Sequence, residues 1–143
     1  ECRYEGRYQY TFEIEESCLS CRMPCLILQP MVENAIQHGI AMKLQDGHVW
    51  IRIYSRGDRI CLEVQDNGVG MTAEQIRNIY DDFQENKSSG SHIGIRNIYR
   101  RLHMYYRDDL KFEFYNMEPG LKIFISLPRK WENKNEIYNG NCG

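Results

Sequence analysis

The sequence predicts a two-layer α/β sandwich in which one mixed, mostly antiparallel sheet is covered on one face by three helices. Apolar and polar residues alternate in several short segments, as they do in half-buried strands. In other segments apolar residues recur at three- and four-residue steps, as they do in amphipathic helices. Turn residues separate two pairs of neighbouring strands, which indicates antiparallel hairpins.

Length and composition indicate one globular domain. The chain has 143 residues, of which 42% are hydrophobic and 27% charged, as is usual for a single folded domain. Its net charge of −2 gives no strong field that would favour nucleic acid or an anionic membrane. We expect no membrane-inserted segment and no signal peptide, because no apolar run is long enough. The folded domain is predicted over residues 1–128 and a frayed, polar C-terminal tail over 129–143.

The first half of the chain begins with a strand and a helix. The strand is predicted over Arg7 to Ile14 and the helix over Pro24 to Gly39, with a polar connection from Ser17 to Arg22. Pro30 fits badly inside a helix, so the regular helix either starts near it or kinks there. Gly39 is a suitable helix terminator.

A hairpin and a capped helix follow. Strands are predicted over Val49 to Tyr54 and Ile60 to Val64, with the turn at Arg56-Gly57-Asp58. Thr72 and Gln75 have the spacing of a capping box, so a second helix is expected to begin there.

The remaining elements are a loop, a helix and a second hairpin. The polar, serine-rich run from Asp81 to Ser91 is predicted to be a mobile loop that orders when a ligand binds. A third helix is expected from about Ile95 to Tyr106. Strands over Leu110 to Tyr115 and Leu121 to Leu127 are expected to form the second hairpin around Glu118-Pro119-Gly120.

Three of the six cysteines, Cys18, Cys21 and Cys25, form a C-x2-C-x3-C cluster. Such spacing can hold zinc, but a structural zinc site needs four ligands, and no second pair follows. The alternative is a set of reduced thiols, with Cys25 and Cys61 buried as small apolar residues.

The first segment whose side chains could bind a ligand or metal is Gln29-Pro30-Met31-Val32-Glu33-Asn34-Ala35-Ile36-Gln37-His38-Gly39. Asn34, Gln37 and His38 are spaced to share one helix face. Amide and carboxylate oxygens on such a face suit a hard cation such as Mg²⁺. A solvated face of an amphipathic helix would carry the same residues.

Two further segments are rich in glycine. Asp66-Asn67-Gly68-Val69-Gly70-Met71 follows a predicted strand, where a carboxylate can accept a hydrogen bond from an exocyclic amine and glycines permit close approach. Ser91-His92-Ile93-Gly94-Ile95-Arg96-Asn97 opens a predicted helix, whose free N–H groups can bind phosphate. Each pattern alone is also typical of an ordinary turn or loop.

The order and spacing of the three segments resemble the N, G1 and G2 boxes of the GHKL ATPase superfamily, which includes gyrase, Hsp90, MutL and the histidine kinases. The residues of the three segments most resemble those of the LytS/YesM-like sensor histidine kinases. The matching segments are Leu28 to Gly39, Asp66 to Met71 and Ile93 to Leu102. The resemblance covers residues 7 to 128 and implies a Bergerat-type fold.

The resemblance also implies an ATP site with Mg²⁺. Asn34 would be the Mg²⁺ ligand, Asp66 would bind the adenine amine, and Glu33 would be a candidate catalytic acid. The remaining positions expected at the ATP site are Gln37, His38, Gly68, Gly70, Gly94, Ile95, Asn97 and Arg101. The lid over the nucleotide would run from about Tyr80 to Ile93.

Several positions depart from the superfamily pattern. Pro30 stands where hydrolytic members have a water-activating glutamate, which argues against gyrase-like ATP hydrolysis. Gln37 replaces a phosphate-binding lysine, His92 replaces a glycine, and Leu121 replaces a threonine near adenine. These differences bear on nucleotide affinity more than on the fold.

The implied function is that of the ATP-binding catalytic domain of a two-component sensor histidine kinase. None of His38, His48, His92 and His103 has the context of a phosphoacceptor, so the acceptor helices, transmembrane helices and sensor are expected before Glu1. The expected partners are ATP, that upstream domain and a response regulator, in a homodimeric full-length protein of the bacterial plasma membrane with this domain in the cytoplasm. Two alternatives remain, an anti-sigma-factor-like serine kinase and a degenerate module that relays conformation without binding nucleotide.

Overall fold

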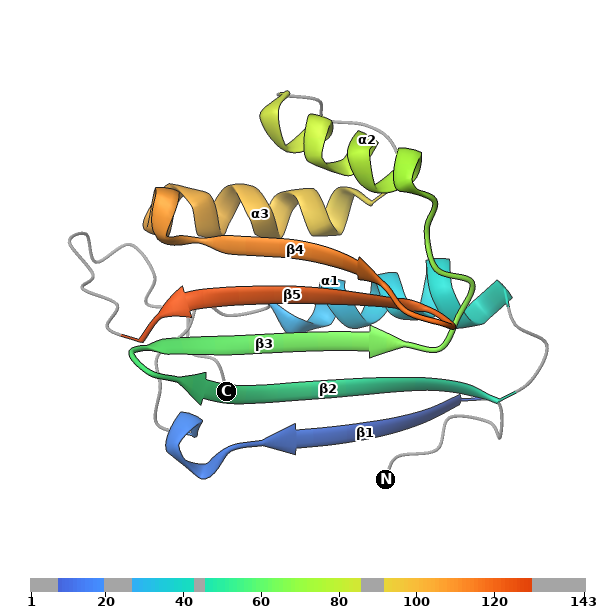
Figure 1. The fold of residues 1–143 in the computed structure, drawn as a ribbon, viewed down its shortest axis with the longest axis horizontal. Helices are drawn as coiled ribbons and strands as arrows, with labels where there is room; N and C mark the ends of the chain where they lie inside the picture. Colours follow the sequence, from blue (N-terminus) through green and yellow to red (C-terminus); the bar gives the residue numbers. More distant parts are fainter. Residues whose placement is uncertain (1–7, 20–26, 43–45, 86–91, 130–143) are drawn as a thin grey trace.

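In the computed structural model, which describes residues 8–19, 27–42, 46–85 and 92–129, one sheet packs against three helices (Figure 1). The strands are β1 (Tyr8–Ile14), β2 (Gly47–Arg56), β3 (Arg59–Asp66), β4 (Lys111–Asn116) and β5 (Leu121–Pro128). The helices are α1 (Leu28–Asn34), α2 (Ala73–Gln84) and α3 (Ile93–Tyr106). The predicted fold class, a mixed sheet in an α/β sandwich, is confirmed.

The strand order across the sheet is β1-β2-β3-β5-β4. The two predicted hairpins are confirmed, since β2 pairs antiparallel with β3, and β4 with β5. The edge strand β1 runs parallel to β2. This order places the end of β3 beside the turn between β4 and β5, which positions the site described below.

The core lies between the helices and one face of the sheet. Alternate residues of β2, β3 and β5 are buried there, as the period of a strand requires, and they pack against buried helix residues such as Met31, Ile98 and Leu102. In Figure 1, α1 passes behind the central strands, while α3 and α2 lie toward the β4 side.

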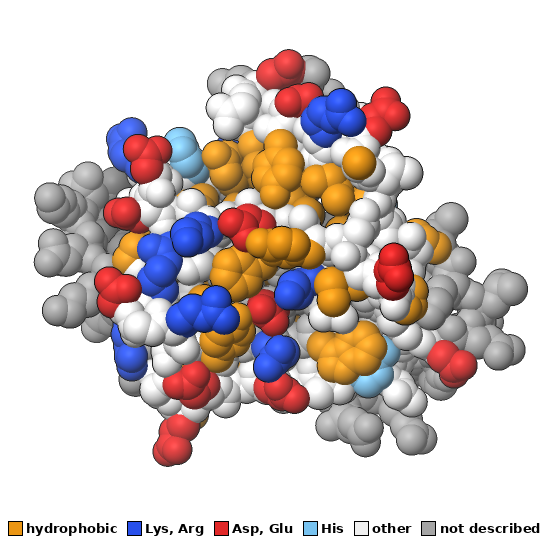
Figure 2. Space-filling view, in the orientation of Figure 1, with side chains coloured by type: hydrophobic (Ala, Val, Ile, Leu, Met, Phe, Trp, Pro, Cys, Tyr) orange, Lys and Arg blue, Asp and Glu red, His pale blue; other side chains and the backbone are white. Residues whose placement is uncertain are grey.

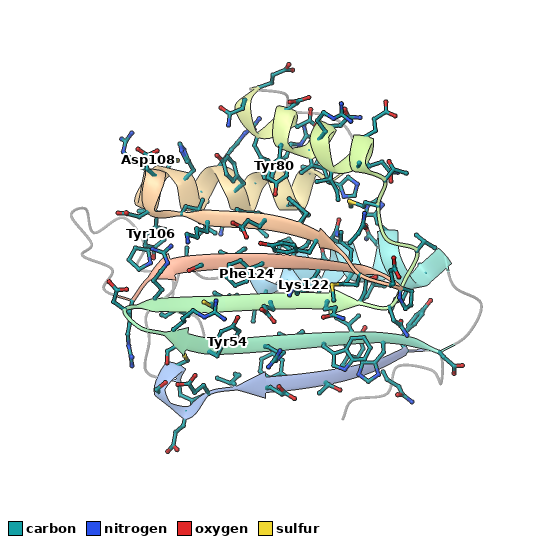
Figure 3. All side chains as sticks on the ribbon, viewed as in Figure 1. Tyr54, Tyr80, Tyr106, Asp108, Lys122 and Phe124 are labelled. Atoms are coloured by element: carbon teal, nitrogen blue, oxygen red, sulfur yellow. The ribbon has the colours of Figure 1, made fainter. Side chains whose placement is uncertain are left out.

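The other face of the sheet carries a charged ladder that turns toward the viewer in Figures 2 and 3. Glu63 is its centre: its carboxylate lies 3.5 Å from Arg52 Nη1 and 4.0 Å from Lys122 Nζ, and it accepts a 2.8 Å hydrogen bond from the Tyr54 hydroxyl. Burial and the neighbouring carboxylate of Glu63 raise the pKa of Tyr54 to about 12. The ladder ties β2, β3 and β5 together on the side away from the helices.

The first helix differs from its prediction. Regular α-helix covers only Leu28–Asn34, with Pro30 in its first turn, where the missing N–H leaves no helical hydrogen bond unmade. A π-helical turn over Ala35–Gly39 and a 3₁₀ turn over Ile40–Met42 then follow. Residues 24–26 lie outside the described part. The prediction that the helix starts near Pro30 is confirmed, while continuous α-helix as far as Gly39 is wrong.

The polar run after Tyr80 is also corrected, because α2 continues through Gln84 and residues 81–84 are not a loop. Phe83 explains the difference: its buried ring stacks on Tyr99 at a centroid distance of 4.0 Å. Residues 86–91, where the rest of the predicted mobile lid falls, lie outside the described part. The next helix, α3, begins at Ile93, two residues before its predicted start.

The described residues contain no helix long and apolar enough to cross a membrane. Cys18 and Cys61 are both buried, which confirms the expectation for Cys61. Cys21 and Cys25 lie outside the described residues, so the zinc alternative stays a prediction, and so does the burial of Cys25. The tail beyond Arg129 lies outside them as well.

Candidate functional site

Asp66, the last residue of β3, lies at the point where three loops meet. Its side chain is buried, and its Oδ1 accepts a 2.8 Å hydrogen bond from the Gly68 N–H. A Cβ on Gly39 would stand 2.7 Å from the Asp66 carboxylate, and one on Gly120 would stand 1.8 Å from the Asp66 carbonyl oxygen. A Cβ on Gly68 would in turn lie 2.2 Å from the Gly39 backbone. The end of the first helical segment, the β3–α2 loop and the β4–β5 turn therefore close on Asp66 at backbone distance.

Two asparagine side chains fasten the β3–α2 loop. The Asn67 Oδ1 accepts a 2.8 Å hydrogen bond from the His48 N–H at the start of β2. On the other side, the Asn116 Oδ1 accepts a 2.9 Å hydrogen bond from the Met71 N–H, and its Nδ2 donates to the Met71 carbonyl. Gly70, between them, has a φ of +70°, which favours glycine. The loop therefore holds Asp66 in one geometry.

A pocket of about 280 Å³ opens between α1 and the start of α3. The predicted site residues in its wall come from two separate segments: Glu33, Asn34, Gln37, His38, Gly94 and Ile95. The structure thus brings the first and third sequence motifs together. Gly94 allows this contact, because a Cβ there would lie 3.1 Å from the Cβ of Pro30.

The polar centre of this pocket is a cluster of Asn34, His38 and His92. Asn34 is only 5% exposed, and its Oδ1 lies 2.7 Å from the Nδ1 of His92. The rings of His38 and His92 pack with a centroid distance of 4.2 Å. Burial, reinforced by His38 and Arg96, lowers the pKa of His92 to about 4, so this imidazole is neutral at pH 7.

Glu33 also lines the pocket, although it points away from Asn34 along the helix surface. Its carboxylate is exposed and accepts a 3.0 Å hydrogen bond from the Gln29 Nε2. A carboxylate at the mouth of a pocket can take a proton from an incoming group.

A second, much smaller hollow lies beside Asp66. It measures about 10 Å³ and shares Asn34 and His38 with the larger pocket, while Met71 and Leu121 close its other side. A purine ring needs more room than this hollow has. Leu121, which stands where the superfamily pattern has a threonine, lines this hollow.

Not every predicted residue reaches the site. Asn97 and Arg101 lie on α3 and line neither hollow, Asn97 being exposed and Arg101 partly buried. Gly68 acts by packing on Gly39, as described above, and Gly70 lines the smaller hollow. Sequence reasoning missed Gly120, Asn116 and the pairing of His92 with Asn34. For Gly120 a signal was present, since a glycine in a predicted hairpin turn marks an unusual φ, here +104°.

The pocket wall fits a magnesium ion and phosphate. Asn34, Gln37 and Glu33 offer amide and carboxylate oxygens, the ligands that Mg²⁺ prefers. The first residues of α3, a helix of 14 residues, add backbone N–H groups at the positive end of a helix dipole. Elsewhere too, the described residues contain no group of three or more His, Cys, Asp or Glu side chains that could hold a metal ion.

Solved structures of histidine kinases have the same fold. The catalytic domain of histidine kinase ThkA matches with a TM-score of 0.63 at 17% identity, over 87% of this chain and 82% of that domain. A blue-light activated histidine kinase of Erythrobacter litoralis matches with a TM-score of 0.60 at 16% identity, over 87% of this chain and 36% of that one. At these identities the likeness shows the fold alone.

Curated relatives are sensor proteins. The chain is 30% identical over 130 residues to the sensor histidine kinase YpdA of Escherichia coli, 91% of this chain and 22% of that protein. It is 28% identical over 127 residues to the sensor histidine kinase YesM of Bacillus subtilis, 88% of this chain and 20% of that protein. The chain therefore spans about a fifth of the length of these relatives.

One family model covers most of the chain. The family described as histidine kinase-, DNA gyrase B-, and HSP90-like ATPase matches residues 22–130, a range that contains all three motifs and both hollows. The resemblance read from the motifs is thereby confirmed: the chain belongs to this ATPase family and has the fold of the histidine kinase catalytic domains within it.

Proposed function

We propose that this chain binds Mg·ATP and transfers the γ-phosphoryl group to a histidine, as the catalytic domain of a sensor histidine kinase. One observation carries the proposal: Asn34 and Asp66, from separate motifs, line two hollows that share Asn34 and His38 as walls. A nucleotide would span this pair of hollows with its phosphates in the larger one and its base beside Asp66, where the smaller hollow would have to widen.

Asp66 is the group proposed to select adenine. Its buried carboxylate accepts the bond from Gly68, and a carboxylate, with about four lone-pair positions, can accept several hydrogen bonds at once. An adenine 6-amino group can donate to it, whereas guanine has a carbonyl oxygen at the same ring position. Asp66 should therefore prefer ATP over GTP.

The larger pocket is proposed to hold the phosphates. Backbone N–H groups at the start of α3 would donate to phosphate oxygens, and Gly94 keeps that backbone close to Pro30. Asn34 would ligate Mg²⁺ through its Oδ1, with the other oxygen donors of the wall around it. The metal supplies neutralisation of charge on the transferred phosphoryl group.

The transfer itself needs an acceptor from outside this chain. A nitrogen of the acceptor imidazole bonds to the γ-phosphorus as the bond from that phosphorus to the β–γ bridging oxygen breaks, and ADP leaves. The attacking nitrogen uses its lone pair, so the proton is lost from the other ring nitrogen of the acceptor imidazole. Glu33 is the proposed recipient of that proton, because its exposed carboxylate lies in the pocket wall. The acceptor would lie on an upstream helical domain, and the phosphoryl group would then pass to a response regulator.

The place of this domain in a longer protein is part of the same proposal. The relatives are named as sensor histidine kinases and are more than four times as long as this chain. We infer a cytoplasmic catalytic domain in a homodimeric receptor of the bacterial plasma membrane.

The test is nucleotide selectivity in Asp66→Asn. Losing a buried, charge-assisted hydrogen bond costs about 1.5–3 kcal/mol, which corresponds to roughly ten- to a hundredfold in affinity. Titration calorimetry should show wild-type protein binding Mg·ATP more tightly than Mg·GTP, and the variant losing most of that preference. Asp108→Asn is the matched control, since Asp108 is exposed in the turn after α3 (Figure 3). A folded Asp66→Asn protein that keeps full ATP affinity and selectivity would refute the assignment.

The second candidate is a degenerate module that relays conformation without nucleotide. Two observations favour it: the hollow at Asp66 is only about 10 Å³, and Gln37 offers no positive charge to phosphates. Absence of any ATP binding by folded wild-type protein would support this candidate over the first.

A further inference from the structure

His92 is one of the residues at the site that depart from the superfamily pattern. It stands where a glycine is expected, and its ring enters the pocket wall between Asn34 and His38. The rest of the site can be assigned without it, so the contact with Asn34 needs its own account.

In that contact the oxygen end of the Asn34 carboxamide faces the His92 ring. An amide oxygen only accepts hydrogen bonds, so at 2.7 Å from Asn34 Oδ1 the His92 Nδ1 must carry the proton and donate it. A carboxamide has one end that can ligate a metal and one end, the NH₂, that cannot. A donor beside the oxygen end selects the orientation in which oxygen lies at this side of the pocket.

His92 is itself held from two sides. Its backbone is the N-cap of α3 with a φ of 63°, and its carbonyl accepts the Arg96 N–H at 3.1 Å. On the α1 side, the ring packs on His38 at 4.2 Å, and the neighbouring Gly94 packs against Pro30. The ring position is therefore set by the packing of α3 on α1.

We infer that His92 is a positioning residue for the metal ligand: it donates its Nδ1–H to Asn34 Oδ1 and leaves the second lone pair of that oxygen for Mg²⁺. The inference rests on the proposed binding of Mg·ATP. Groups that orient a metal ligand through a hydrogen bond commonly contribute about 10- to 100-fold to metal affinity. His92, at the start of α3, would orient Asn34, which lies at the end of α1.

The structure offers a matched set of variants at position 92. Both Gly and Asn tolerate the left-handed backbone of this position, whereas Ala would add strain. His92→Gly removes the donor without straining the chain. His92→Asn places an amide N–H close to where Nδ1 stands and restores the donor. His103→Gly, at an exposed histidine on the same helix, controls for loss of an imidazole.

The experiment is calorimetric titration of each protein with ATP, once with excess Mg²⁺ and once with EDTA. His92→Gly should weaken Mg·ATP binding about tenfold or more and change metal-free ATP binding less than about twofold. His92→Asn should recover most of the loss, and circular dichroism should show all variants folded. His103→Gly should be indistinguishable from wild type except in stability, because Gly lowers helix propensity.

Several results would overturn the inference. Tighter Mg·ATP binding by His92→Gly would mean that the ring obstructs the site. An equal loss with and without Mg²⁺ would mean that His92 contributes to the pocket as a whole, and an Asn variant as weak as the Gly variant would exclude the hydrogen bond as the cause. A wild-type protein that does not bind Mg·ATP would refute the proposed function together with this inference, whereas wild-type binding with no effect at position 92 refutes the inference alone.

Discussion

At the scale of single residues, the site depends on a few polar groups held by close backbone packing. Asp66 is enclosed by Gly39, Gly68 and Gly120, each of which admits no Cβ without a collision below 3 Å. Such packing leaves Asp66 one position, and a fixed carboxylate can recognise an amine at low entropic cost.

Asn34→Ala should separate metal binding from nucleotide binding. Removing the amide oxygen takes away the proposed Mg²⁺ ligand but leaves Asp66 unchanged. Affinity for Mg·ATP should fall about tenfold or more, while affinity for adenosine, which carries no phosphate, should change little. Calorimetry with the two ligands measures both. Equal losses would mean that Asn34 shapes the fold or the adenine end.

Much of the site could be predicted at this scale, but its pairings could not. Asp66, Asn34 and Gly94 were identified from local motifs, because each motif needs a particular residue type at a particular spacing. The contact between His92 and Asn34 was missed because it joins segments far apart in the chain, and no local pattern encodes it. Asn116 was missed for the same reason, since its partner Met71 belongs to another loop.

At the scale of elements, α2 shows how a local signal fixes one end of a helix and a tertiary contact the other. The capping box predicted at Thr72 is present, with the Gln75 N–H donating to Thr72 Oγ1 at 3.1 Å and the Gln75 side chain accepting from the Thr72 N–H at 2.8 Å. The end of this helix was not predictable from the polar run. Phe83 packs against Tyr99 and Phe112 in the core, and this tertiary contact extends the helix.

Thr72→Ala should destabilise the domain by about 1 kcal/mol, because it leaves the Gln75 N–H without its cap. Thr72→Ser keeps the hydroxyl and should stay within a few tenths of a kcal/mol of wild type. Urea denaturation followed by circular dichroism measures both. Nucleotide affinity should not change, since Thr72 lines neither hollow. An Ala variant as stable as wild type would show that the cap adds nothing measurable.

The π-helical turn over Ala35–Gly39 is a feature that the sequence pattern did not predict. An apolar stripe read with a period of 3.6 residues predicts continuous α-helix, and the change of period shows only in the structure. Such turns occur often at functional sites. Here the turn ends at Gly39, which packs against the Asp66 carboxylate. The irregular segment therefore brings the end of the Asn34 motif into contact with the Asp66 motif.

At the scale of the whole molecule, the fold brings three motifs to one region, and the proposed acceptor would come from outside this chain. None of the four histidines has the sequence context expected of a phosphoacceptor, and Pro30 stands where the hydrolytic members of the superfamily are expected to have a glutamate. ATP bound to this chain alone would therefore lack an oriented nucleophile. Orientation accounts for about 7–11 kcal/mol of a barrier, so its absence costs many powers of ten in rate.

The chain by itself should therefore bind ATP without labelling itself. Incubation with γ-labelled ATP should leave the protein unlabelled and release phosphate very slowly. Adding the upstream helical domain of the same protein should produce label that is lost in acid and stable in base, as expected of phosphohistidine. Acid-stable label would indicate a serine acceptor instead, and steady phosphate release at an ordinary enzymatic rate would contradict the interpretation of Pro30.

The most direct test of the central claim is a calorimetric titration of the wild-type chain with ATP, in the presence and absence of Mg²⁺. We predict saturable binding of one nucleotide per chain that tightens when Mg²⁺ is present, because Asn34 and the start of α3 would contact the metal and the phosphates while Asp66 would contact the base. No binding by the folded protein, or binding of equal strength with and without Mg²⁺, would contradict it.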